Sequence, residues 1–197
     1  MSWARRSVPV YLSAGGPRSL ELAGEIADGV IMHLGIQPEI LRDAVARVHA
    51  GALRAGRDPA AVKLWAQASV RVSDDVETSI ESMKSSLAAR VHLVFGSTFE
   101  GKHVPEEHAP TIRRVLEAYQ PAAQLLPGGQ NAALVDDPAF LRYLAERFAI
   151  VGPPEVCVER LREIEAAGVP NVLFGFGGAN RRPLFRALGE QVLPHLA

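Results

Sequence analysis

The chain has 197 residues, of which 48% are hydrophobic and 22% charged, with a formal net charge of −1. That length suits one domain with a substantial core, and a nearly neutral chain without a basic block gives no sign of a nucleic-acid or membrane-surface partner. No apolar run approaches the roughly 18–20 residues that span a bilayer, and the first residues lack the apolar segment of a secretory signal. The single cysteine, Cys157, excludes an internal disulfide and suits a reducing compartment, so we expect a cytoplasmic protein.

Strands and helices are predicted to alternate along the chain. Apolar, β-branched runs indicate four strands, at 8–12, 30–32, 62–72 and 170–176, and a brief extended segment at 148–152. Helical spacing of apolar residues indicates helices at 17–28, 38–55, 76–95, 106–119, 138–146, 153–167 and 183–196. This alternation is typical of a parallel sheet covered by helices. About four strands in roughly half the usual length predict half of a (β/α)8 TIM barrel, or a small open α/β sheet.

One region interrupts the alternation. Between 120 and 138 the sequence, which includes LLPGGQNAALVDDP, predicts a long irregular connection. Connections of that length are commonly lids, binding loops or disordered segments. We interpret 96–146 as a variable insertion within one domain that spans 1–197, with a lid as one hypothesis for its loop.

A small-residue turn after the first strand is the strongest candidate for a binding site. Ligands of parallel α/β folds bind at the carboxyl ends of the strands. Ser13-Ala14-Gly15-Gly16 precedes a helix that begins near Pro17, so free N–H groups and the helix dipole favour an anion such as a phosphate. We expect a side chain at Gly15 to enter the phosphate space. The spacing matches neither a Walker loop nor GxGxxG, and an ordinary turn is the alternative interpretation.

His33 is the histidine best placed for chemistry, because it follows the predicted strand at 30–32. A general-acid or substrate-contact role is one hypothesis for it, and an ordinary residue at a strand end is the other. The remaining histidines lie in predicted helices or beside a loop and lack the spacing of a metalloprotease helix, so no metal is expected. No serine occupies a nucleophile elbow.

Two stretches resemble one known family. Residues 8–31 read VPVYLSAGGPRSLELAGEIADGVI, and residues 148–174 read FAIVGPPEVCVERLREIEAAGVPNVLF. The first is similar to the fifth strand and following helix of luciferase-like monooxygenases, in the branch that uses the deazaflavin coenzyme F-420 and includes the methylenetetrahydromethanopterin reductases. The second is similar to the last helix and eighth strand of that family.

The resemblance implies the C-terminal half of a TIM-barrel oxidoreductase that moves a hydride between the deazaflavin and a small organic substrate. It implies that the turn binds the phosphate of the coenzyme and that the strand after the helix lines the ring. The residues concerned are Ser13, Ala14, Gly15, Gly16, Pro17, Ile31 and His33.

The same resemblance leaves strands one to four of the barrel, with their acid and base residues, without a counterpart in this chain. Catalytic residues are therefore unassigned. Half a barrel also leaves two unpaired sheet edges, so we expect a homodimer or association with an N-terminal half. Two alternatives stay open: half of an FMN-dependent monooxygenase, and a non-catalytic cofactor-binding subunit.

Overall fold

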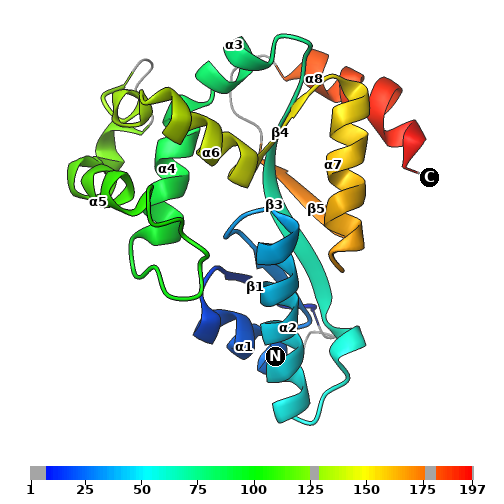
Figure 1. Cartoon of the computed structure of the whole chain (residues 1–197). Coiled ribbons are helices and arrows are strands. Elements are labelled where there is room, and N and C mark those ends of the chain that lie inside the picture. Colours follow the sequence, from blue (N-terminus) through cyan, green and yellow to red (C-terminus); the bar gives the residue numbers. More distant parts are fainter. Residues whose placement is uncertain (1–7, 125–128, 176–180, 197) are drawn as a thin grey trace.

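A computed structural model describes residues 8–124, 129–175 and 181–196 (Figure 1). Within these ranges the chain alternates between strands and helices, as the sequence predicts, and every strand pair is parallel. The strands are β1 (Tyr11–Ala14), β2 (Gly29–Met32), β3 (Lys63–Val72), β4 (Ala149–Gly152) and β5 (Asn171–Gly175). The residues predicted to follow the last strand, Gly177 and Gly178, lie outside the described ranges.

The long strand β3 organises the sheet. Its first residues pair with β2, which pairs in turn with β1. Ser69 of β3 is paired with both Ala149 of β4 and Gly175 of β5, so these two strands lie on opposite edges of β3. β4 is the brief extended segment expected at 148–152, and it makes the sheet five-stranded rather than four-stranded.

Each predicted helical region contains an α-helix, but the bounds differ, and two regions do not form one continuous α-helix: 76–95 is divided in two, and 183–196 continues as shorter helical turns after Ala187. They are α1 (Pro17–Ile26), α2 (Pro38–Arg54), α3 (Val76–Glu81), α4 (Lys84–Phe95), α5 (Ala109–Ala118), α6 (Pro138–Phe148), α7 (Pro154–Ala166) and α8 (Arg182–Ala187). Shorter helical turns lie at Pro59–Ala61, Pro121–Ala123, Ala132–Val135, Leu188–Val192 and Leu193–His195. Among the described helices, none combines the length and the apolar character that crossing a membrane requires.

The single helix predicted over 76–95 is wrong, because the structure divides it into α3 and α4. At the break, the Ser82 hydroxyl donates to the carbonyl of Ser79 over 2.7 Å, and the Ser86 hydroxyl donates to that of Met83 over 2.8 Å. Serines that bond their own backbone in this way compete with the regular helical hydrogen bonds.

The two faces of the sheet differ in burial. Side chains alternate between faces along a strand, and one face supplies Ala14, Val30, Met32, Ala66 and Val70, each at most 1% exposed, to the core beneath the helices. The opposite face, here called the inner face, carries Tyr11, Ser13, Ile31, Trp65, Gln67, Ser69, Arg71, Asn171 and Leu173 in register. It is less covered, since Tyr11 is 40% and Leu173 39% exposed.

Candidate functional site

The predicted binding turn is shorter than its sequence suggests. β1 ends at Ala14 rather than at Leu12, because its parallel pairing with Gly29–Met32 continues as far as the pair Ala14 and Met32. Ser13 and Ala14 are therefore strand residues, and the expectation that they form the turn is wrong. Ala14 is buried in the core, so the turn proper is Gly15 and Gly16, with α1 beginning at Pro17 as predicted.

His33 lies directly over the first glycine of this turn. Its Nδ1 is 3.0 Å from the Ser13 hydroxyl, and a Cβ placed on Gly15 would lie 2.4 Å from its Nε2. The imidazole therefore occupies the space that a side chain at Gly15 would enter first. Glycine is needed at this position for the close approach of the histidine ring.

Open space lies instead beside the second glycine. A Cβ at Gly16 would meet nothing nearer than the Ser19 hydroxyl at 3.8 Å and Lys102 Cε at 4.0 Å. The Gly16 N–H already donates to Ser19 Oγ over 3.1 Å, and Pro17 has no N–H. The N–H groups of Arg18 and Ser19, in the first turn of α1, have no acceptor within the helix and form an anion-binding terminus. The turn therefore has room for a phosphate beside Gly16. It offers fewer backbone N–H donors than the sequence suggests, because the Gly16 N–H is already bonded and Pro17 has none.

Two cationic side chains bias this end of the sheet toward anions. The pKa of His33 is lowered from 6.5 by burial first, then by the positive charges of Arg90 and Lys102. The histidine is therefore neutral at pH 7. Lys102 is 3% exposed and its ammonium donates to the Val94 carbonyl over 2.5 Å; burial, with the charge of Arg147, lowers its pKa.

Arg147 of α6 holds Lys102 in place. Its guanidinium is fully buried and donates to the carbonyls of Leu34 and His103, each over 3.0 Å, and to that of Lys102. These bonds tie the loop after α4 to the end of β2, where His33 lies. Arg147 is thus a positioning residue for the turn and its neighbours.

A second hollow lies at the carboxyl end of β3 and β5. It has a volume of about 330 Å³ and is lined by Gln67, Ser69 and Arg71 of β3, by Arg90 of α4, and by Gly175. Arg90 donates to Gln67 Oε1 over 2.8 Å, which joins α4 to the inner face.

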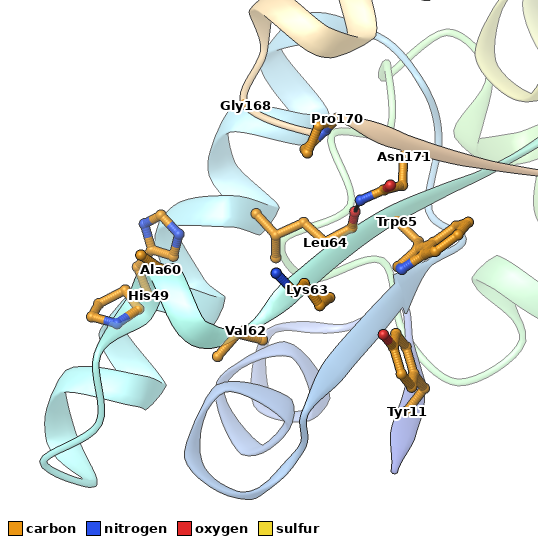
Figure 2. Close-up of a pocket in the computed structure, with 11 residues that line it drawn as sticks. Tyr11, His49, Ala60, Val62, Lys63, Leu64, Trp65, Gly168, Pro170 and Asn171 are labelled. Carbon is orange, nitrogen blue, oxygen red and sulfur yellow. Dashed lines mark hydrogen bonds between the residues drawn. The ribbon is translucent and has the colours of Figure 1, made fainter. Parts of the chain in front are cut away.

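A larger hollow, of about 500 Å³, lies at the amino end of the same strands (Figure 2). Tyr11 and Trp65 lie beside each other there, with their ring centroids 6.5 Å apart and an edge-to-face angle of 74°. The Trp65 indole Nε1 is buried and has no hydrogen-bond partner among the described residues. Asn171 donates to the Leu64 carbonyl over 3.0 Å. Ligands of parallel α/β folds bind at the other end of the strands, so this aromatic hollow is not the candidate site.

The structure therefore brings together most of the residues that the sequence singled out. Gly15, Gly16, Pro17 and His33 meet around the start of α1, with Ser13 bonded to the histidine. Ile31 is paired with Ser13 on the inner face, half-buried.

The sequence interpretation missed Arg90 and Lys102. Arg90 had a detectable signal, because it shares the buried side of α4 with Leu87 and Val94, where an arginine is unexpected. Lys102 lies in a loop, where no periodic pattern of the sequence marks it as buried.

Comparison with known proteins assigns the family. The model of the luciferase-like monooxygenases matches residues 1–171. The chain belongs to this family. The 5,10-methylenetetrahydromethanopterin reductase of Methanolobus tindarius is 29% identical to it over 98% of the chain and 56% of its own length. The F-420-dependent glucose-6-phosphate dehydrogenase of Microbacterium testaceum is 27% identical over 97% of the chain and 49% of its own length.

A solved structure agrees with this assignment. The coenzyme F-420-dependent tetrahydromethanopterin reductase of Methanopyrus kandleri superposes with a TM-score of 0.71 at 28% identity, over 96% of the chain and 51% of its own length. The predicted fold class, half of a TIM-barrel-type α/β fold, is thereby confirmed. The chain spans about half the length of the curated relatives it matches.

Proposed function

We propose that this chain is the coenzyme-binding half of a barrel oxidoreductase that transfers a hydride between coenzyme F-420 and a small organic substrate. The observation that carries the proposal is the open space beside Gly16, at the start of α1 and next to Lys102. It offers the backbone donors and positive surroundings that the phosphate of a deazaflavin side chain requires. Relatives that name this coenzyme act on different substrates, which supports the coenzyme more strongly than any one substrate.

The residues of this chain would bind and orient the coenzyme rather than carry out proton transfer. The proposed contacts are those predicted from the sequence: Ser13, Ala14, Gly15, Gly16, Pro17, Ile31 and His33. Bound deazaflavin would supply the hydride chemistry. A neutral His33 held by Ser13 can donate or accept one hydrogen bond without placing a charge beside the ring. Ala14 would act only through its backbone, since its side chain lies in the core.

Titration of F-420 and FMN in parallel, followed by absorbance and fluorescence, tests this proposal. We expect saturable binding of F-420 and at least about tenfold weaker binding by Gly16→Val, whose side chain would fill the phosphate space. Gly189→Val is the matched control, because a Cβ there meets nothing within 4 Å. FMN binding alone would favour the monooxygenase alternative, and binding of neither coenzyme would overturn both.

We also propose that the inner face is covered by the other half of a barrel. The strands β1 and β5 each have one paired neighbour among the described strands, and the exposed Tyr11 and Leu173 leave apolar surface beside them. Unpaired strand edges with apolar side chains are a liability that a partner removes.

Native mass spectrometry of the chain isolated from its own cells tests this partner. A complex with one further polypeptide, or a chain carrying a preceding half-barrel, is the expected result. A homodimer would show that a second copy closes the sheet, and a stable monomer of 197 residues would contradict both. We also propose a cytoplasmic location. Cell fractionation tests it, and we expect to recover the chain in the soluble cytoplasmic fraction.

A further inference from the structure

Two arginines face the 330 Å³ hollow at the carboxyl end of β3. Arg90 is 9% exposed, and within the described residues its guanidinium donates one hydrogen bond, to Gln67 Oε1. Arg71 is half-buried and donates to the carbonyl of its own neighbour Val70 over 2.8 Å. Burial lowers the pKa of both guanidinium groups. Each therefore has several N–H donors left over beside the same hollow.

Neither arginine has a carboxylate to balance its charge. The ion pairs found within the described residues all involve other side chains. No Asp or Glu lines the hollow. The residues outside the described ranges contain no Asp or Glu either. Two half-buried or buried cations without a counter-ion are costly, which is a reason to expect an anion between them.

The hollow has the size and donors that suit a small anion. A volume of about 330 Å³ is within the range of small-molecule sites, roughly 300–1,000 Å³. The planar fork of an arginine matches a carboxylate or phosphate with two parallel hydrogen bonds. The side-chain oxygen of Gln67 accepts the hydrogen bond from Arg90, so the amide N–H groups of Gln67 remain available as donors. The Ser69 hydroxyl is a further donor that lines the hollow.

We propose that this hollow, the Arg71–Arg90 pocket, binds the phosphate or carboxylate group of a small-molecule ligand. The pocket is formed by β3, β5 and α4, whereas the turn at Gly16 lies between β1 and α1. Arg90 lines the pocket, and its charge also acts on His33 beside the turn. The pocket places a second anion at the same end of the sheet as the coenzyme. The assignment of this pocket to an anionic group of the substrate rests on the proposed function. The proposal that the pocket binds an anion does not depend on that function.

Calorimetric titration of inorganic phosphate into the full chain, at constant ionic strength in NaCl, tests the pocket. The Gly16→Val background removes the turn as a competing site. We expect saturable binding that Arg71→Gln weakens by about ten- to a hundredfold, as for a charge-assisted pair. Arg71→Lys should restore part of it, since the charge remains but the fork is lost. Arg142→Gln, an exposed arginine paired with Glu77, is the matched control and should leave binding unchanged.

Three results would overturn the pocket. One is the absence of saturable phosphate binding, and another is equal affinity in Arg71→Gln with unchanged circular dichroism. The third is binding by the isolated chain but not by the complex taken from its cells, because a carboxylate of the second polypeptide would then fill the pocket. Should Arg71→Gln not fold, Ser69→Ala with a weakened affinity provides the same test.

Repeating the titration with saturating F-420 identifies the source of the anion. Phosphate binding that persists supports a substrate group in the pocket. Phosphate binding that F-420 abolishes would overturn the substrate assignment and give the pocket to the coenzyme's own anionic tail. If F-420 does not bind at all while phosphate does, the proposed function fails and the anion pocket stands.

Discussion

The two ends of the inner face are built from the same strands but have opposite chemistry. At the carboxyl end, His33, Arg71 and Arg90 surround the turn and the smaller hollow. At the amino end, Tyr11 and Trp65 line the larger one (Figure 2), and the buried indole N–H of Trp65 has no hydrogen-bond partner in the part of the chain that the structure describes. The strands run parallel, so all of their carboxyl ends, and the helix that starts after β1, meet at one edge.

The difference shows that the size of a hollow is a poor guide to its role. The amino-end hollow is the larger by about 170 Å³ (about 500 against 330 Å³), yet it lies at the end of the strands opposite to the one where parallel α/β folds bind their ligands. Convergent donors, positive charge and a helix N-terminus are found at the carboxyl end. We therefore expect ligand binding at the carboxyl end and a role in packing at the amino end. Variants at the two ends should therefore separate coenzyme affinity from stability.

Gly15→Ala should have the largest effect, and it should act on coenzyme affinity. The new Cβ would lie 2.4 Å from His33 Nε2, so the ring must leave its bond to Ser13. Overpacking of this kind costs about 1–3 kcal/mol of stability, and displacement of the ring should weaken F-420 binding at least about tenfold. Gly189→Ala, which meets open space, should change neither quantity. If the Gly15→Ala variant folds and its affinity for F-420 is unchanged, the assignment of His33 to the coenzyme site is wrong.

His33 should also give the carboxyl end a pH dependence that the amino end lacks. Its folded pKa lies below the ordinary histidine value of 6.5, so the unfolded chain binds more protons in that range. Stability therefore rises with pH between the folded and unfolded pKa values and is lost as the pH falls through them, by about 1.4 kcal/mol for each unit of difference. Urea unfolding from pH 5 to 8 should show this slope, and His33→Asn should flatten it. An identical slope in the variant would contradict the half-buried, neutral histidine.

Much of the fold could be predicted from the sequence, because hydrophobic periodicity determines it. The helices at 38–55 and 153–167 agree with α2 and α7 to within one residue at each end, since Pro and Gly limit them. The errors came from contacts distant in sequence. The predicted first strand, 8–12, begins three residues and ends two residues before β1, because only the pairing with β2 defines the bounds of that strand. The short run 148–152 became a strand because the far end of β3 offered it an edge.

The candidate site was predicted less well, for a related reason. The turn and His33 each follow a strand, so their position at one edge could be inferred from a parallel sheet. Arg90 reaches that edge from α4, and Lys102 reaches it from the insertion at 96–146. No local pattern in the sequence predicts where these segments pack. Arg147 lies between the helix predicted at 138–146 and the extended segment at 148–152, and the sequence assigns it no role. Its hydrogen bonds reach the carbonyls of Leu34, Lys102 and His103, each more than 40 residues away in the chain.

Trp65→Phe should change stability by no more than about 1 kcal/mol in the isolated chain. Phenylalanine loses some packing but removes a buried N–H that has no partner, a defect that costs about 1–3 kcal/mol, so the two effects oppose each other. Coenzyme affinity should not change. In the complex with another half-barrel the sign should reverse, if that half supplies the missing acceptor. Chemical unfolding of the chain and of the complex measures both, and an equal effect in the two would exclude an acceptor from the partner.

Tyr11→Leu should have the smallest effect. Tyr11 contacts Trp65 edge to face, and such a pair contributes about 0.5–1.5 kcal/mol beyond the burial of its area. Because Tyr11 is 40% exposed, we expect its replacement to lower the free energy of unfolding by about 0.5 kcal/mol, the lower limit of that range. F-420 affinity should stay within about twofold, because Tyr11 lies two residues from Ser13 along β1 and at the opposite end of the inner face. Urea unfolding and coenzyme titration of the same preparation measure the two quantities together. If coenzyme affinity fell while stability did not, the two ends would be coupled through β1, and the separation of binding from packing would not hold.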